Sequence, residues 1–201
     1  MSNGHGLLKL FNTIGLILIL GISMNVEAGF FGLFGGSEKW KEEVRLSDGR
    51  VIVVERELIS EAGGDEWASN RSGSKPKEYR IRFSHPDRAQ EKIEWRSTKI
   101  SPQTWPEIPL VFDIESGKPV IFSIVAISAG CEIYSKHILQ NGVWIEEVLP
   151  EQFVLRTTNL LFGSHKDMPT FVNLEDKRTR NNYIGVRKAL MRVGPNHKVC
   201  G

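Results

Sequence analysis

The chain has 201 residues, of which 25% are charged and 40% hydrophobic, and it suits one soluble domain or at most two small ones. These fractions exclude a wholly disordered, collagen-like or polytopic membrane chain. The 26 Lys and Arg residues exceed the 24 Asp and Glu residues by a net charge of only +2, so the chain lacks the overall basic field of many nucleic-acid-binding proteins. Two cysteines exclude a cysteine-dense scaffold and a four-cysteine zinc ribbon.

Residues 1–28 predict a signal peptide. Lys9 supplies the positive amino-terminal region, and residues 14–22 form an apolar core. Val26 and Ala28 stand at the −3 and −1 positions that a signal peptidase reads. The apolar core is about 9 to 11 residues long, whereas a membrane-spanning helix needs roughly 20. We therefore expect cleavage after Ala28 and a periplasmic or secreted protein.

The alternative is an uncleaved amino-terminal helix that anchors the protein in the inner membrane. Such a helix would begin at Leu7 and extend about 18 residues to Met24. Residues 29–38 follow as a leader rich in Gly and Phe. This composition indicates a flexible segment, or one that contacts the membrane surface.

Alternating apolar and polar residues predict an antiparallel β meander from Trp40 onward. Four hairpins are expected, joining residues 40–46 with 51–56, 79–83 with 93–95, 110–114 with 119–127, and 131–134 with 143–145. The nearly continuous apolar run over 120–127 predicts a central strand covered on both faces. Asn141-Gly142 is the strongest short hairpin signal of the chain. The fold class is therefore mainly β, with about eight strands in a sandwich, an open barrel or a partial propeller.

The last part of the chain changes character and predicts a short helical segment. Residues 149–153 resemble a helical turn that begins with a proline, and residues 154–162 suit a strand or a helix equally. Asn173 is expected to cap a helix that begins at Leu174, with acidic residues in its first turn. Residues 39–201 thus form a single β-rich domain whose carboxyl-terminal tail begins at about residue 174.

A polar segment rich in Gly and Ser interrupts the strand pattern between residues 59 and 77. A loop of that length inside a compact domain is functional or mobile. We expect an interaction loop whose contact residues are Trp67, Asn70 and Arg71. The alternative is that Trp67 packs back on the core.

The tail carries a local excess of positive charge, with seven basic and two acidic residues from Leu174 onward. Such a tail suits contact with a membrane surface or an acidic partner, and the alternative is a solvated helix face. Nucleic acid is not expected as a partner, because the chain carries an export signal and no recognised nucleic-acid module. The candidate contact residues are Lys177, Arg178, Arg180, Arg187, Lys188 and Arg192.

Cys131 and Cys200 are predicted to form one disulfide, because thiols are oxidised in the compartment that the signal implies. Closing the loop between these two cysteines with a disulfide stabilises the fold by roughly 4 kcal/mol in chain-entropy models. The bridge would hold the tail on the sheet. The alternative is two free thiols.

No motif assigns catalytic, cofactor or metal-binding residues. His85, His137 and His165 lack the spacing of a zinc site, and no phosphate-binding loop or nucleophile elbow is present. Ser72-Gly73-Ser74-Lys75 matches a Ser-x-x-Lys motif by its letters alone. An enzyme would have to assemble its site from dispersed histidines and carboxylates.

The opening of the domain resembles exported proteobacterial proteins, some of them lipoproteins. The similar string is Trp-Lys-Glu-Glu-Val from Trp40, followed by Asp-Gly-Arg from Asp48 and Val-Val-Glu-Arg from Val53. The tryptophan-bearing strands and residues 149–153 look similar as well. The lipobox cysteine of the lipoprotein members is missing here. The resemblance implies a compartment and a class, and no functional residues.

The sequence therefore favours an exported envelope or periplasmic protein that binds a partner or ligand without catalysis, through its sheet edges and the 59–77 loop. Two alternatives remain open. One is a hydrolase or lyase that acts on envelope material, and the other is an exported inhibitor or toxin-neutralising partner. The partner expected in either binding case is a protein or another envelope component.

Overall fold

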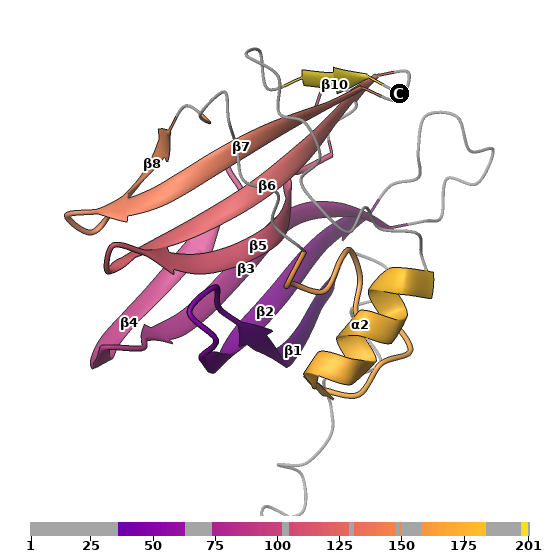
Figure 1. Ribbon diagram of the computed structural model, residues 1–201. Helices are drawn as coiled ribbons and strands as arrows, with labels where there is room; N and C mark the ends of the chain where they lie inside the picture. Colours follow the sequence, from indigo (N-terminus) through magenta and orange to yellow (C-terminus); the bar gives the residue numbers. More distant parts are fainter. Residues whose placement is uncertain are drawn as a thin grey trace, which may run out of the picture. The chain divides into compact units, whose positions relative to one another are not determined.

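The computed structural model describes residues 36–62, 74–101, 105–128, 131–147, 149, 158–183 and 198–200. In these residues the chain forms ten strands and one helix (Figure 1). Residues 36–201 make up one compact unit. The predicted signal peptide and most of the Gly/Phe leader lie outside the described residues, and the end of that leader, from Gly36, belongs to the first strand. Within the described residues no helix has the length and apolar character needed to cross a bilayer.

The first sheet has the strand order β4-β3-β2-β1-β9. Strands β1 to β4 are antiparallel neighbours, and the two-residue β9 pairs in parallel with β1. The first two predicted hairpins are confirmed, although β2 and β3 extend into the segment expected to be a loop. The bounds are β1 Gly36–Arg45, β2 Val51–Ala62, β3 Ser74–His85, β4 Arg88–Arg96 and β9 Phe171–Val172.

The second sheet consists of β5 Ile108–Glu115, β6 Lys118–Ser128 and β7 Cys131–Gln140, with β8 Val143–Glu147 and β10 Lys198–Cys200. Since β6 occupies one edge of β7, the short strands β8 and β10 share its other edge. The predicted turn between β7 and β8 is confirmed. Asn141 and Gly142 have φ angles of 51° and 79°, the left-handed values that a two-residue hairpin turn needs.

The two sheets pack face to face around one apolar layer. Alternate residues of the first sheet, such as Trp40 and Ile81, meet residues of the second sheet such as Ile121. Phe83 and Phe112 lie edge to face at 4.5 Å between ring centroids and mark this contact. The architecture is therefore a sandwich of two mainly antiparallel sheets, one of the three arrangements that the sequence allowed.

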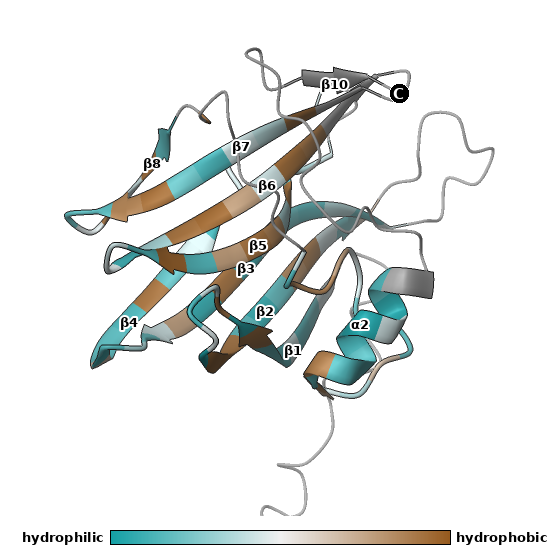
Figure 2. Ribbon diagram, viewed as in Figure 1, coloured by the Kyte–Doolittle hydropathy of each residue, from teal (hydrophilic) through white to brown (hydrophobic). Residues whose placement is uncertain are grey.

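Strand β6 is covered on both faces, as its apolar run predicts. Ile121 lies in the layer between the sheets, whereas Val120 and Phe122 point to the opposite face. A second apolar cluster forms there, and Leu149 and Phe162 contribute to it. Figure 2 shows the contrast between β6, which is largely hydrophobic, and the alternating bands of the first sheet.

Single side chains link the edges of the two sheets. At one side the Asn159 amide accepts a hydrogen bond from Phe112 N (2.9 Å) and donates to Phe112 O (2.7 Å) on the edge strand β5, and it also donates to Arg45 O (3.0 Å) at the end of β1. At the other side Trp144 Nε1 donates to Glu94 O of β4 (2.8 Å). In the part of the chain that the structure describes, no ladder joins the sheets, so the sandwich is not a closed barrel.

The helix α2 spans Leu174–Tyr183, as predicted. Asn173 Oδ1 accepts hydrogen bonds from Glu175 N and Asp176 N, both at 2.9 Å, and this confirms the predicted cap. Residues 158–162 are neither strand nor helix. Apart from Leu149, the helical turn expected at 149–153 lies outside the described residues.

Candidate functional site

The outer face of the first sheet carries a cross-strand ladder of charges. Strand alternation places Trp40 and Arg56 in the core, and Lys39, Lys41 and Glu55 on the opposite face. Neighbouring strands supply opposite charges, which favours their pairing. The cross-strand ion pairs include Lys39–Glu57, Lys41–Glu55, Arg80–Glu57, Arg82–Glu57 and Arg82–Glu94. Arg96–Glu94 adds a pair within β4.

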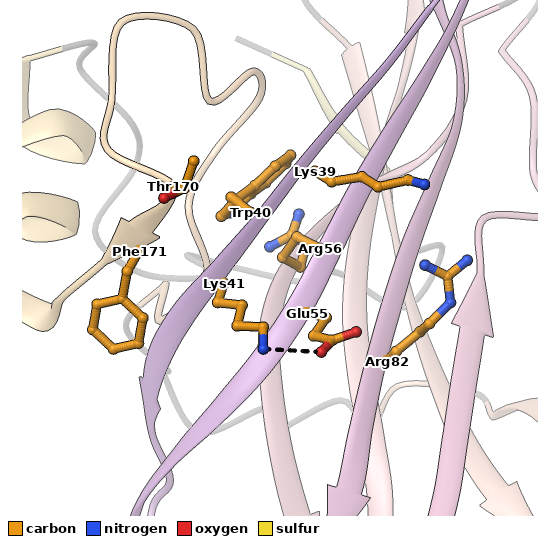
Figure 3. Close-up of a pocket in the computed structure, with 8 residues that line it drawn as sticks. All are labelled: Lys39, Trp40, Lys41, Glu55, Arg56, Arg82, Thr170 and Phe171. Carbon is orange, nitrogen blue, oxygen red and sulfur yellow. Dashed lines mark ion pairs between the residues drawn. The ribbon is translucent and has the colours of Figure 1, made fainter. Parts of the chain in front are cut away.

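Two adjoining hollows lie on this face. The first, of about 350 Å³, is lined by Lys39, Trp40, Lys41, Glu55, Arg56, Arg82, Thr170 and Phe171 (Figure 3). The second, of about 550 Å³, is lined by Lys41, Val53, Glu55, Arg82, Phe83, Ser84, Lys92, Ile93 and Glu94. Because both contain Lys41, Glu55 and Arg82, together they form one open groove, here called the transverse groove, which crosses the sheet from β9 to β4.

The exposed charges of the transverse groove are unequal. Its lining includes the cationic side chains of Lys39, Lys41, Arg82 and Lys92 but only two carboxylates, those of Glu55 and Glu94. Arg56 also lines it, but the guanidinium of that residue is buried and paired with Glu42. The groove therefore presents a surplus of positive charge.

The carboxylates beside the groove are already neutralised. Burial acts to raise the pKa of Glu94, but hydrogen bonds from Arg96 and Arg82 outweigh it and leave that pKa below its ordinary value. Burial also acts to raise the pKa of Glu57, but the hydrogen bond from Arg82 and the charges of Arg82, Lys39 and Arg80 outweigh it. The pKa of Glu57 is therefore lowered as well. Lys92 differs from the other cations, because its Nζ donates to Ser84 Oγ (2.7 Å) and pairs with no carboxylate among the described residues.

Apolar side chains are exposed at both hollows. Phe171 of β9 is 44% exposed, and Val53 of β2 is 48% exposed. Strand β9 places Phe171 directly beside Lys41, its register partner. The transverse groove thus offers both charged and apolar contacts, a combination that suits a ligand with both kinds of group.

His137 is in a buried polar cluster in the second sheet. Glu107 Oε2 accepts hydrogen bonds from Ser123 Oγ (2.6 Å) and from His137 Nε2 (2.9 Å). A serine nucleophile would need the serine and the acid on opposite nitrogens of the imidazole, whereas here both approach Nε2. All three side chains are buried, so the cluster is structural.

The Glu107 carboxylate is held in its charged form. Burial alone would raise its pKa, but hydrogen bonds from His137, Ser123 and Thr98 N, with the charge of His137, lower the pKa to about 2. Glu107 Oε1 also accepts from Lys99 N (3.1 Å). This carboxylate therefore links the backbone of the β4–β5 connection, at Thr98 and Lys99, to the buried side chains of Ser123 and His137.

The other two candidate histidines also have structural partners. His85 Nε2 lies 3.1 Å from Gly117 O, and its Nδ1 accepts from Asp87 N (3.2 Å) within the β3–β4 turn. The His165 ring stacks on Trp40 at 5.3 Å between centroids. None of the three histidines lines the transverse groove.

Two Ser–Lys pairs occur in the described part of the chain, and neither is arranged as a nucleophile. Lys92 is exposed to solvent, whereas a catalytic lysine base is desolvated. Lys99 Nζ donates to Ser135 Oγ (2.7 Å) but is also ion-paired with the Glu146 carboxylate (2.5 Å), so the amine is shared between two partners. Among the described residues no three His, Cys, Asp or Glu side chains are grouped to hold a metal ion.

The structure buries one residue of the predicted basic contact tail. Lys177 lies 3.5 Å from Glu42 Oε2 and donates to Glu43 O, so it fastens α2 to β1. Burial lowers the pKa of Lys177, although the charge of Glu42 opposes the change. Glu42 is fully buried and also pairs with Arg56 (2.5 Å).

The remaining tail residues have different surroundings. Arg178 is exposed and pairs with Glu175 (2.7 Å), and Arg180 is partly buried. Arg187, Lys188 and Arg192 lie outside the described residues.

Of the other predicted site residues, the structure describes the two cysteines but not those of the interaction loop. Trp67, Asn70 and Arg71 lie outside the described residues, and the two ends of their predicted loop, residues 59–62 and 74–77, belong to β2 and β3. For the predicted disulfide the backbone register is clear, since Cys131 of β7 and Cys200 of β10 are directly opposite each other.

The sequence did not predict the transverse groove. Charged residues that line it, such as Arg82 and Lys92, stand next to apolar residues along their strands. Which of them converge depends on the register of four strands, which alternation alone does not specify.

No family model, no curated protein and no solved structure matches this chain. The fold defines the class as a mainly β sandwich of two sheets with one short helix near the carboxyl terminus.

Proposed function

We propose that the protein is an exported, non-enzymatic binding protein of the bacterial envelope or periplasm, and that its ligand lies in the transverse groove. The observation that carries this proposal is the groove itself. It is open, crosses a whole sheet and combines exposed apolar groups with a surplus of cations. The resemblance of the domain opening to exported proteobacterial proteins, and the predicted signal peptide, support the compartment.

The same geometry favours binding over catalysis. An enzyme of the envelope would need a histidine and carboxylates that converge on an accessible cleft. The closest arrangement, His137 with Glu107, is buried, and the lining of the groove includes no histidine. The proposed binding site is therefore a sheet face and not the sheet edges that the sequence favoured. The edge strands β5 and β4 already form hydrogen bonds with Asn159 and Trp144.

The binding proposal is tested with the apolar residues of the groove. The protein without residues 1–28 is immobilised and exposed to a detergent extract of its own envelope. The double variant Phe171→Ser/Val53→Ser should lose a component that the wild type retains, because a small polar side chain removes the apolar contact. The matched control Val143→Ser/Ile145→Ser changes two exposed apolar residues of β8, outside the groove, and should retain that component. Identical retention by all three proteins would contradict the proposal.

Export is tested separately. The mature protein recovered from the periplasm or medium should begin at Gly29, which amino-terminal sequencing determines directly. A chain that begins at Met1 or Ser2 and fractionates with the membrane would indicate the anchored alternative.

A further inference from the structure

We propose that the transverse groove binds an acidic polypeptide segment in an extended conformation, whose carboxylates contact the groove lysines. This inference rests on the proposed function, since it names the ligand of the same groove. Four features of the groove support it: the charge of the lining, the weakness of the ion pairs already present, the exposed apolar groups and the length of the groove.

The lining is complementary to a negatively charged ligand. Four cationic side chains reach the groove against two carboxylates. Glu94 is held by both Arg82 and Arg96, so this carboxylate is neutralised before any ligand arrives. A surplus of one sign in a hollowed surface attracts ligands of the other sign and favours their encounter.

The lysines are free to change partners. Lys39 is 68% exposed and lies 3.6 Å from Glu57, and Lys41 is 58% exposed and lies 3.3 Å from Glu55. The Lys41–Glu55 pair is exposed at both partners and therefore weak, so a ligand carboxylate can join or replace it at little cost. Glu57 is buried but also pairs with Arg80 and Arg82, so it keeps two cations when Lys39 turns to a ligand. Lys92 requires no exchange at all, because its partner is the Ser84 hydroxyl.

The apolar groups favour a peptide over an acidic glycan. Phe171 and Val53 are exposed on either side of Lys41. A peptide with alternating acidic and aliphatic side chains presents carboxylates to the lysines and aliphatic groups to these residues. An acidic polysaccharide carries the charge but no aliphatic side chains.

The dimensions suit a short segment. The groove crosses the five strands of the first sheet, which at about 4.8 Å between neighbours spans roughly 19 Å. An extended peptide rises about 3.3 Å per residue, so about six residues fill that length.

The experiment uses a fluorescein-labelled peptide of six alternating Glu and Leu residues, and fluorescence anisotropy at low ionic strength. The peptide should bind the full mature protein, and binding should weaken as salt is added, since the contacts are exposed charges. An analogue with Gln in place of Glu should bind at least about tenfold more weakly. An oligogalacturonate of similar length, which is an acidic glycan, should compete poorly.

Matched variants locate the contact. Lys41→Gln/Lys92→Gln should weaken binding of the Glu peptide about tenfold, because two charge contacts are lost. The control Lys118→Gln/Arg88→Gln removes the same charge from exposed positions outside the groove and should change affinity less than about twofold. Circular dichroism verifies that every variant is folded.

Several outcomes would overturn the inference: equal binding of the Gln analogue, equal loss in the control variant, or competition by oligogalacturonate as strong as that of the peptide. Failure here is distinguishable from failure of the proposed function. If the acidic peptide does not bind but capture from the envelope still depends on Phe171 and Val53, the groove is a binding site for another class of ligand. If capture is also independent of these residues, both proposals fail.

Discussion

The buried carboxylate of Glu107 joins several parts of this domain through hydrogen bonds. It accepts hydrogen bonds from two side chains of the second sheet, His137 and Ser123, and from the backbone at Thr98 and Lys99. A buried carboxylate without such partners would be strongly unfavourable. Removing it leaves the buried donors of Ser123 and His137 without this acceptor, so the carboxylate stabilises the fold.

The lowered pKa of Glu107 predicts a stability that depends on pH. Its folded pKa of about 2 lies below the ordinary 4.5, so its contribution is complete above about pH 4.5 and is lost as the pH falls toward 2. The wild type should exceed Glu107→Gln in free energy of unfolding by about 3 kcal/mol at pH 7, and this difference should shrink between pH 4.5 and 2. Urea unfolding at a series of pH values measures it.

The exposed Glu146→Gln variant serves as the control for this measurement, because it removes a carboxylate outside the buried cluster. It should follow the wild type throughout the pH range. A difference between wild type and Glu107→Gln that stays constant down to pH 2 would show that the carboxylate is not the titrating group.

At the level of elements, Asn159 supplies the edge strand β5 with hydrogen bonds that a neighbouring strand would otherwise provide. Its amide satisfies both backbone groups of Phe112 and also Arg45 O of β1. Asn159→Ala should lower the free energy of unfolding by about 2 kcal/mol, because it leaves buried backbone groups unpaired. Chemical denaturation measures the loss, and hydrogen exchange at the Phe112 amide should accelerate.

Asn159→Asp separates the two roles of this amide. The carboxylate still accepts from Phe112 N, so that amide should remain protected, while both donated hydrogen bonds are lost. Equal exchange at Phe112 in the Ala and Asp variants would contradict the pairing.

The cap of α2 gives a second prediction for an element. Asn173→Ala should destabilise the helix by about 1 kcal/mol, because Glu175 N and Asp176 N lose their acceptor. Hydrogen exchange across α2 reports this loss, and Asn173→Ser should largely restore protection. Since α2 carries Lys177 to Glu42, unchanged exchange in the Ala variant would mean that this buried contact alone holds the helix.

Elements were predicted well where their signals are local. Alternation located β1 to β4, Asn141-Gly142 located the β7–β8 turn, and Asn173 located the start of α2. The prediction failed at residues 59–62 and 74–77, which pair as extensions of β2 and β3. The polar and glycine-rich composition there resembles a loop, but pairing with the neighbouring strand overrides that local preference.

At the scale of the whole molecule, the predicted disulfide would join β10, near the carboxyl terminus, to the first residue of β7. Cα atoms of directly opposed residues in antiparallel strands lie about 4.5 to 5.5 Å apart, within the range of about 4.4 to 6.8 Å that disulfides use. The register of β7 and β10 places Cys131 and Cys200 in that relation. We therefore keep the bridge as a prediction, which the proposed export would favour.

Peptide mapping without reductant tests it, and should recover the two cysteine peptides as one linked species. Cys200→Ser should then lower the free energy of unfolding by roughly 2 to 4 kcal/mol. Full alkylation of both thiols in the denatured, unreduced protein would exclude the bridge.

The sequence by itself determined the β class, the order of the main hairpins, the central position of β6 and the capped helix. These features follow from side-chain periodicity and turn chemistry within a few residues. Only the tertiary structure decided that the sheets form a sandwich, that Glu107 meets His137 across 30 residues, and that Glu42 meets Leu161 across 119. It also decided that Lys41, Arg82 and Lys92 surround one groove. Such contacts depend on strand register and on the packing of one sheet against another, which no local pattern encodes.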